Sequence, residues 1–244
     1  MYSFVVEINN YDKTWKQIWE DRVTPKYGEI NTLQRLIKLN GFDKAPNTFT
    51  DNEWRVLVSF IIETAQIKKQ NNVLEIGCGS GALLKGLKDE INCKIYGVDA
   101  SKTLLKIAQE VLPKDTFFNL DASEISKIEN RFDCIILHSV IQYFPDQNYL
   151  LEILNKSFDL LNSKGKLVLL DLPDIAQKNN VAQDPVISAL KEEIKSSHPN
   201  HLYLDKFWLN QTLISIGFSK ITELRYPIAT YHNSKYRFSL MVEK

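Results

Sequence analysis

From residue 71 onward, short apolar runs alternate with segments in which apolar residues recur every three or four positions. The apolar runs predict strands at 71–76, 94–99, 115–121, 132–140 and 166–172. Between them, the helical spacing predicts helices at 82–91, 102–112 and 149–162. Strands and helices in strict alternation are typical of an α/β, doubly wound, mostly parallel sheet. We therefore expect this fold class, with the strand at 132–140 covered by helices on both faces.

The two ends of the chain follow other patterns. Tyr11, Trp15, Ile18 and Trp19 share one helical face, and a capping-box pattern at 50–53 precedes a helix from Trp54 to about residue 68. A further helix is predicted around Leu33, Leu36 and Ile37, ending at Asn40-Gly41. Residues 1–70 are thus expected to form a helical N-terminal cap.

The remainder, 71–244, is expected to form the core domain. Within it, the polar, proline-containing stretch 173–204 is predicted to be an insertion or lid. A helix at 206–218 is followed by two β-rich runs joined by "ATYHNS". These runs predict a closing pair of strands and bring the expected sheet to seven.

Composition excludes several classes of protein. The 244 residues contain 30 Lys plus Arg and 30 Asp plus Glu, without the basic patch of a nucleic-acid-binding protein. We find no signal peptide or membrane-spanning run, so no membrane partner is expected. The three cysteines, Cys78, Cys93 and Cys134, lack metal-site spacing, and their small odd number fits a cytoplasmic protein.

A glycine-rich turn, "VLEIGCGSG", follows the first predicted strand. Glycines at 77, 79 and 81 allow positive φ and close approach of a ligand, and the next helix begins with free N–H groups. Asp99 ends the second strand, where a carboxylate can accept hydrogen bonds from both hydroxyls of a ribose. Glu75 precedes the first glycine, where its charge would repel a pyrophosphate but favour a cationic ligand. A nicotinamide dehydrogenase is disfavoured because its fingerprint is Gly-x-Gly-x-x-Gly.

Over about residues 70–172, the chain resembles the class I S-adenosylmethionine-dependent methyltransferases. The resemblance rests on "VLEIGCGSG", "GVDAS", "NLDAS", "FDCIILHSVIQYFPD" and "LNSKGKLVLLD", which occur in the order of that family. The segment "HSVIQYFPD" is most similar to small-molecule enzymes and to the N-methylating domains of peptide synthetases. The N-terminal cap and the tail "YHNSKYRF" are similar to small methyltransferases of polysaccharide and natural-product clusters.

The resemblance implies S-adenosylmethionine as cofactor, with S-adenosylhomocysteine as product. The glycine turn would surround the methionine part, Asp99 would hold the ribose, and Asp121 or the backbone beside it would bind the adenine amine. In full, the implied cofactor-binding residues are Glu75, Gly77, Cys78, Gly79, Gly81, Asp99, Ala100, Ser101, Leu104, Asp121, Ala122 and His138.

His138 is the first candidate for a general base, and a plain hydrogen bond to the cofactor is the equal alternative. His201 is the second candidate. His198 and His201 have no acidic partner at a metal-ligand spacing, so no metal site is expected. The candidate substrate-binding residues, each of which could instead serve in packing or in a loop, are Tyr11, Trp15, Trp19, Tyr27, Gln142, Tyr143, His232, Tyr236 and Arg237.

The function expected from these residues is methyl transfer to oxygen of a small polar metabolite. A sugar nucleotide or a phosphorus-containing capsule precursor would fit. One alternative is an N-methyltransferase of natural-product biosynthesis, and another is a non-catalytic S-adenosylmethionine-binding subunit. The sequence leaves open whether the protein is a monomer or a homodimer.

Overall fold

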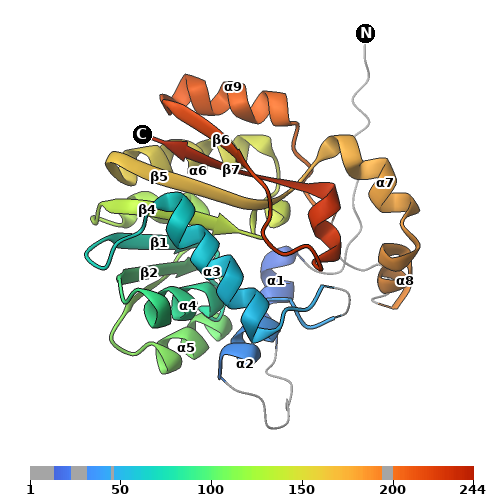
Figure 1. The fold of residues 1–244 in the computed structure, drawn as a ribbon, viewed down its shortest axis with the longest axis horizontal. Coiled ribbons are helices and arrows are strands. Elements are labelled where there is room, and N and C mark those ends of the chain that lie inside the picture. The colour runs from blue at the N-terminus through green and yellow to red at the C-terminus, as the bar shows by residue number, and fades with distance from the viewer. Residues whose placement is uncertain (1–13, 23–31, 45–46, 194–199) are drawn as a thin grey trace.

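The central sheet of the protein has seven strands, as expected. The computed structural model describes residues 14–22, 32–44, 47–193 and 200–244. The strand order is β3-β2-β1-β4-β5-β7-β6 (Figure 1). The strands are β1 (Asn72–Ile76), β2 (Lys94–Asp99), β3 (Thr116–Asn119), β4 (Phe132–His138), β5 (Leu161–Pro173), β6 (Lys220–Leu224) and β7 (Arg237–Glu243).

Parallel pairing brings the carboxyl ends of the first five strands to one edge of the sheet. β1 pairs in parallel with β2 and β4, β2 with β3, and β4 with β5. β7 runs antiparallel to both β5 and β6, which confirms the predicted closing pair. The order reverses at β1, with β2 on one side and β4 on the other, and ligands of open α/β sheets bind at such a point.

Helices cover both faces of the sheet (Figure 1). One face carries α3 (Asp51–Ala65), α4 (Ala82–Glu90) and α5 (Lys102–Val111), and the other carries α6 (Gln147–Leu160) and α9 (Lys206–Ile216). The apolar residues form two buried clusters, one on each face, which accounts for the near-continuous apolar pattern of β4.

The N-terminal helices join the first of these clusters. α2 (Thr32–Leu39) contributes Leu36 and Ile37, and α3 contributes Trp54, all at most 1% exposed. α1 (Trp15–Glu20) is a single turn and a half that lies against α5. Because α2 and α3 share a hydrophobic core with α4 and α5, these two helices pack as part of the sheet's helical layer.

The insertion after β5 is helical. It contains η3 (Ile175–Gln177), α7 (Lys178–Gln183) and α8 (Pro185–Glu193), which extend beyond the carboxyl edge of the sheet (Figure 1). Several boundaries differ from expectation by one to five residues. β5 begins at Leu161, five residues early, and β3 ends at Asn119, because Asp121 instead caps the 3₁₀ helix η1 (Ala122–Lys127). No helix of the described residues is long and apolar enough to cross a membrane.

Candidate functional site

The glycine turn after β1 needs glycine for steric as well as conformational reasons. Gly77 and Gly79 have φ of 78° and 53°, in the left-handed region. A Cβ on Gly77 would lie 2.3 Å from Cγ2 of Val140, and one on Gly79 would lie 2.5 Å from Oδ1 of Asn40. The turn therefore packs against the segment after β4 and against the end of α2.

Asn40 holds this turn in place, and sequence reasoning missed it. Its Nδ2 donates to the carbonyl oxygen of Cys78 at 3.1 Å, and its Oδ1 accepts from the backbone N–H of Ser80 at 2.8 Å. The hydroxyl of Ser80 also donates to this Oδ1. The Asn40-Gly41 pair carried a signal for the end of a helix only, so its second role came from the tertiary structure.

Two carboxylates stand beside the turn. Oδ2 of Asp99 accepts from the N–H of Gly79 and Oδ1 accepts from the N–H of Ser101, both at 2.8 Å. Burial raises the pKa of Asp99, although these backbone donors act to lower it. Glu75 is 2% exposed, and its Oε2 accepts no hydrogen bond from the described residues. Burial, and secondarily the charge of Asp99, raises the pKa of Glu75 well above its usual value.

Asp121 also lines the site, and its carboxylate is already hydrogen-bonded. Its Oδ1 accepts from the N–H of Ser123 at 3.0 Å and from the hydroxyls of Ser123 and Tyr149. Although burial acts to raise it, the hydrogen bonds from Tyr149 and Ser123 lower the pKa of Asp121. Asp121 is therefore an anchored acceptor rather than a mobile one.

These groups line one cavity of about 160 Å³ at the carboxyl edge of the sheet. Nearly all of the implied cofactor-binding residues are on its wall: Glu75, Gly77, Gly79, Asp99, Ala100, Ser101, Leu104, Asp121, Ala122 and His138. The other two do not line it. Cys78 is a fully buried residue of the turn, and Gly81 is the N-cap residue of α4.

α1 covers this cavity and is fastened to the start of α5. Oε2 of Glu20 accepts from the N–H of Lys102 at 2.7 Å, and Oε1 accepts from the hydroxyl of Thr103 at 2.9 Å. The hydroxyl of Ser101 donates to the carbonyl oxygen of Trp19 at 3.2 Å. This places Trp15 and Trp19 on the cavity wall. Tyr11 and Tyr27 lie outside the described residues.

Tyr143 and His201, two more of the candidate site residues, lie beside Trp15. The ring of Tyr143 lies 4.7 Å from Trp15 and 5.2 Å from Trp19, and Tyr143 lines the cavity. His201 stacks on Trp15 at 5.1 Å and lies 5.5 Å from Tyr143. The structure thus brings residues from α1, η2 (Ile141–Tyr143) and the segment before α9 into one aromatic wall.

His138 ends β4 and is buried between aromatic rings. It stacks on Phe42 at 5.7 Å and on Tyr226 at 6.2 Å, and its Nε2 shares a hydrogen bond of 3.0 Å with the Tyr226 hydroxyl. Burial lowers the pKa of His138 to about 4. The imidazole is therefore neutral at physiological pH, with one nitrogen engaged by Tyr226.

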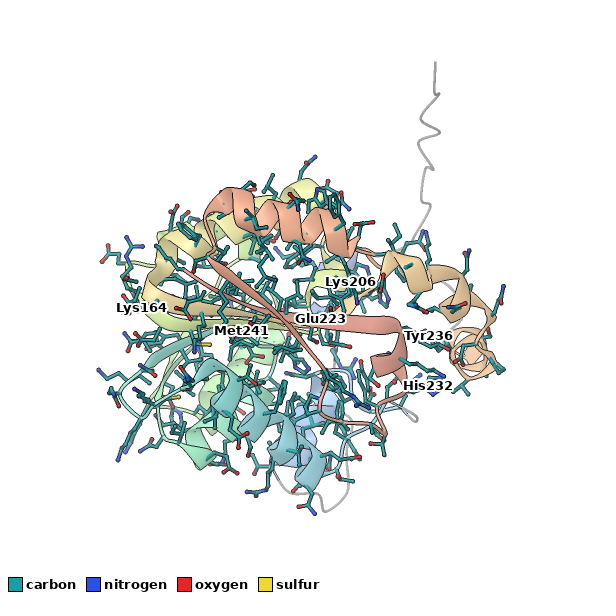
Figure 2. The ribbon with its side chains drawn as sticks, turned by 45° about the horizontal axis from the view of Figure 1, so that its top comes forward. Lys164, Lys206, Glu223, His232, Tyr236 and Met241 are labelled. Carbon is teal, nitrogen blue, oxygen red and sulfur yellow. The ribbon has the colours of Figure 1, made fainter. Side chains whose placement is uncertain are left out.

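His232 and Tyr236 gather instead around Asp184, at the start of α8 (Figure 2). Nε2 of His232 lies 2.9 Å from Oδ2 of Asp184, which also accepts from the Tyr236 hydroxyl and from Nζ of Lys235 at 3.0 Å. Asp184 in turn accepts from the N–H of Ile187 in the first turn of α8. These side chains fasten the insertion to the loop before β7.

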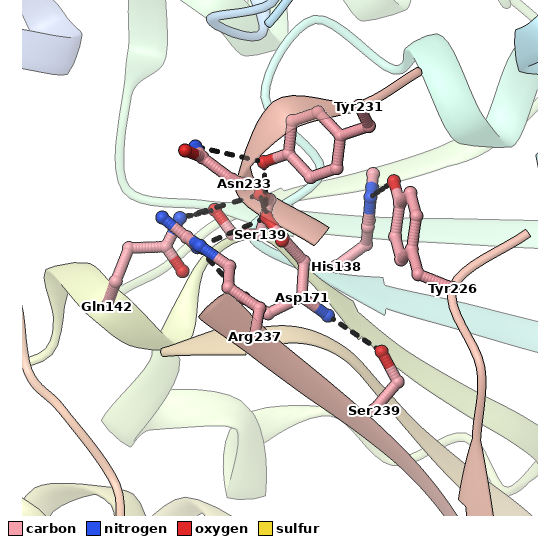
Figure 3. A network of polar contacts seen from close by, with 9 residues as sticks. All are labelled: His138, Ser139, Gln142, Asp171, Tyr226, Tyr231, Asn233, Arg237 and Ser239. Carbon is pink, nitrogen blue, oxygen red and sulfur yellow. Dashed lines mark hydrogen bonds and ion pairs between the residues drawn. The ribbon is translucent and has the colours of Figure 1, made fainter. Parts of the chain in front are cut away.

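Arg237 joins a polar network centred on Asp171, which sequence reasoning missed (Figure 3). Nη1 of Arg237 donates to the carbonyl oxygen of Asp171 at 2.9 Å and to its Oδ2 at 3.2 Å. The hydroxyls of Ser139 and Tyr231 donate to the same Oδ2. Gln142 joins through Nε2, which donates to the carbonyl oxygen of Ser139 at 2.7 Å. Asp171 lay inside a predicted strand, so no local pattern marked it.

The cavity fits the sulfonium nucleoside that the sequence resemblance implies. Asp99 offers two carboxylate oxygens for a ribose diol, each with a lone pair beyond its backbone bond. Glu75 places an unpaired carboxylate oxygen next to the turn, where a cationic group would complete it. No group of three His, Cys, Asp or Glu side chains in the described ranges could hold a metal ion.

Known proteins resemble parts of this chain in sequence. A family profile described as a methyltransferase domain matches residues 47–207. Nonribosomal peptide synthetase TES of Alternaria alternata is 35% identical over 104 residues, which are 38% of this chain and 2% of the synthetase. Malonyl-(acyl-carrier protein) O-methyltransferase 1 of Ilyobacter polytropus is 27% identical over 143 residues, which are 57% of this chain and 48% of that protein. The chain spans less than two thirds of the length of these curated relatives.

The fold is shared with solved methyltransferases. Magnesium protoporphyrin IX methyltransferase (ChlM) from Synechocystis PCC 6803, with bound S-adenosylhomocysteine, superposes with a TM-score of 0.55 at 18% identity, over 94% of this chain and 90% of that chain. At this identity the superposition establishes a common fold. Because the family profile covers most of the chain, the protein belongs to the methyltransferase domain family, and its cofactor is S-adenosylmethionine.

Proposed function

We propose that this protein transfers a methyl group to a hydroxyl oxygen of a small polar metabolite. The observation that carries the proposal is a cavity whose wall includes both the glycine turn with Asp99 and the side chains of Ser139, Tyr143 and His138. Some of its lining groups suit a sulfonium nucleoside, and its aromatic and hydroxyl-bearing side chains suit a second, small ligand. A sugar nucleotide or a phosphorus-containing capsule precursor is the proposed type of acceptor. A cytoplasmic location stays a prediction.

In this reaction the chain mainly positions its ligands. S-adenosylmethionine supplies a methyl group on a sulfonium, whose departure as a neutral thioether needs no proton. The proton that the acceptor hydroxyl loses passes to water or to the neutral imidazole of His138, which lines the cavity. The glycine turn, Asp99 and Glu75 hold and orient the nucleoside and amino acid parts. The aromatic wall formed by Trp15, Trp19 and Tyr143 excludes water and confines the acceptor.

Nitrogen transfer is the second candidate. It is favoured by the similarity of "HSVIQYFPD" to N-methylating domains and by the match to a peptide synthetase. A non-catalytic subunit that binds the cofactor for a partner protein is the third. The three candidate functions can be told apart by whether the purified chain methylates a hydroxyl, an amine or neither.

The test is turnover of radiolabelled S-adenosylmethionine by the purified chain on paired small molecules that differ only in a hydroxyl or an amine. We expect S-adenosylhomocysteine and an O-methylated product with the hydroxyl members. Products with the amine members alone would establish the second candidate. Tight cofactor binding without transfer to any acceptor would support the subunit instead.

We also expect the protonation of His138 to leave transfer unaffected across the neutral range. With a pKa of about 4, the imidazole is already neutral at pH 5, so its basic form does not decline until the pH falls toward 4. When kcat is measured from pH 5 to pH 8, it should not fall at low pH with an inflection near pH 6.5. Such an inflection, abolished by His138→Ala, would contradict the buried, neutral histidine.

A further inference from the structure

Ser139 and Asp171 are neighbours at the carboxyl ends of β4 and β5. His138 pairs with Leu170, so the residues that follow them lie side by side. Both have left-handed backbones, with φ of 54° at Ser139 and 65° at Asp171. Non-glycine residues in this region cost about 1–3 kcal/mol each, and such strain gathers at functional sites. One of these two adjacent residues, Ser139, lines the cavity, and the other, Asp171, is buried beside it.

The network around Asp171 is incomplete in one specific way. Its Oδ2 accepts hydrogen bonds from Ser139, Tyr231 and Arg237, whereas its buried Oδ1 accepts none from the described residues. Gln142 repeats this pattern. Its Nε2 donates to Ser139, and its buried Oε1 has no donor in the described part of the chain. A buried polar atom without a partner costs about 1–3 kcal/mol.

All of these unfilled positions are hydrogen-bond acceptors. The hydroxyl proton of Ser139 is committed to Asp171, so towards the cavity this oxygen can only accept. The matching ligand group must therefore be a donor. A phosphate or carboxylate, which offers only acceptors, does not complete this network.

The charges around the Asp171 network narrow the choice of ligand further. The carboxylate of Asp171 is balanced by the guanidinium of Arg237, whose side chain is 12% exposed. Other titratable groups facing the network are Tyr143, Tyr203, Tyr226 and Tyr231, whose pKa values are all raised by burial, and the neutral His138. The site has no surplus negative charge to attract an ammonium group. The network is therefore suited to a neutral hydrogen-bond donor, and the ligand group of this kind that we consider is a hydroxyl.

We propose that Ser139, Gln142 and Asp171 form a hydroxyl-binding subsite for the methyl acceptor, which carries a neutral polyol at this end. The proposal rests on the proposed function, because it places the acceptor next to the cofactor cavity. Ser139 lines the cavity and makes the first contact. Gln142 and Asp171 do not line the cavity themselves; both are buried and hydrogen-bonded to Ser139, and their unpartnered oxygens accept from a ligand hydroxyl that enters past Ser139. Tyr143 supplies the flat apolar surface beside them.

Binding of simple sugars tests the proposal without knowledge of the natural acceptor. The chain is saturated with S-adenosylhomocysteine, and ligand-observed saturation-transfer NMR is recorded with methyl α-D-glucopyranoside, glucosamine and glucose 6-phosphate. We expect methyl α-D-glucopyranoside to bind most strongly. Ser139→Ala and Gln142→Met should each weaken its binding by about tenfold, the effect of one buried hydrogen bond. Asp171 is left intact, because its loss would leave Arg237 buried and unpaired.

Ser157→Ala is the matched control. Ser157 is a fully buried serine on α6 whose hydroxyl has no partner in the described residues; unlike Ser139 it does not line the cavity, and unlike Gln142 and Asp171 its side chain is not bonded to a residue that does. This variant should bind the glucoside as the wild type does. Preferred binding of the phosphate or the amine, absence of glucoside binding, or equal binding by all variants would overturn the subsite. Calorimetry with S-adenosylhomocysteine separates the two failures, since loss of cofactor binding in the wild type would instead overturn the proposed function.

Discussion

Replacing Asp99 by alanine is expected to raise the dissociation constant for S-adenosylhomocysteine by about a hundredfold or more. Two hydrogen bonds to a carboxylate contribute about 1.5–3 kcal/mol each, and both would be lost with the ribose diol. The change also removes the acceptor for the N–H of Gly79, which shapes the glycine turn. Isothermal titration calorimetry measures the effect directly.

Asp115→Ala is the control for this variant. Asp115 is also a largely buried aspartate, with its side chain 8% exposed, but it pairs with Lys88 at 2.8 Å and does not line the cavity. Its loss should lower stability and leave the cofactor dissociation constant unchanged. If Asp99→Ala bound the cofactor within about threefold of wild type, well below one lost hydrogen bond, the ribose site would be misplaced.

Replacing Glu75 by glutamine is expected to stabilise the cofactor-free protein at high pH while weakening cofactor binding. The pKa of Glu75 is raised in the folded protein, so folding holds a proton that the unfolded chain releases. This contribution to stability is fully present below the unfolded pKa near 4.5, and it is lost as pH rises towards the folded pKa. A glutamine has no such dependence, so the stability difference in favour of the variant should grow from pH 5 to pH 8.

The same variant should bind S-adenosylmethionine about tenfold or more weakly, because a desolvated carboxylate opposite a cationic ligand is lost. The loss for S-adenosylhomocysteine, which lacks the sulfonium charge, should be smaller. Urea unfolding at several pH values and calorimetry with both ligands measure the two effects. A wild-type protein whose stability did not fall relative to the variant with rising pH would show that Glu75 is not held in a raised-pKa site.

Cofactor affinity and stability are thus opposed at Glu75. The free protein keeps the carboxyl group of Glu75 buried, with an oxygen that no described residue partners and next to Asp99, so its ionisation at rising pH costs folding energy. The cost is removed only when a cation arrives. The orphan acceptors of Asp171 and Gln142 have the same character, although there the missing partner is a neutral donor.

The sequence by itself determined the sheet, its seven strands and the cofactor edge. Apolar periodicity marked the strands because parallel strands are buried on both faces, and the glycine turn with Glu75 and Asp99 marked the edge because these residues are close together along the chain or end neighbouring strands. Most of the implied cofactor-binding residues accordingly line one cavity. These local patterns predict the site because the alternation of strands and helices implies a parallel sheet whose carboxyl ends meet at one edge.

Only the tertiary structure decided which distant side chains complete the site. Asn40 reaches the glycine turn from α2, and Glu20 fastens α1 to α5. Asp171 accepts hydrogen bonds from Ser139, Tyr231 and Arg237, which lie far from it along the chain. His232 and Tyr236 contact Asp184 instead. No periodicity encodes these contacts, because each depends on the packing of elements far apart in the chain and on where a buried polar atom finds its partner.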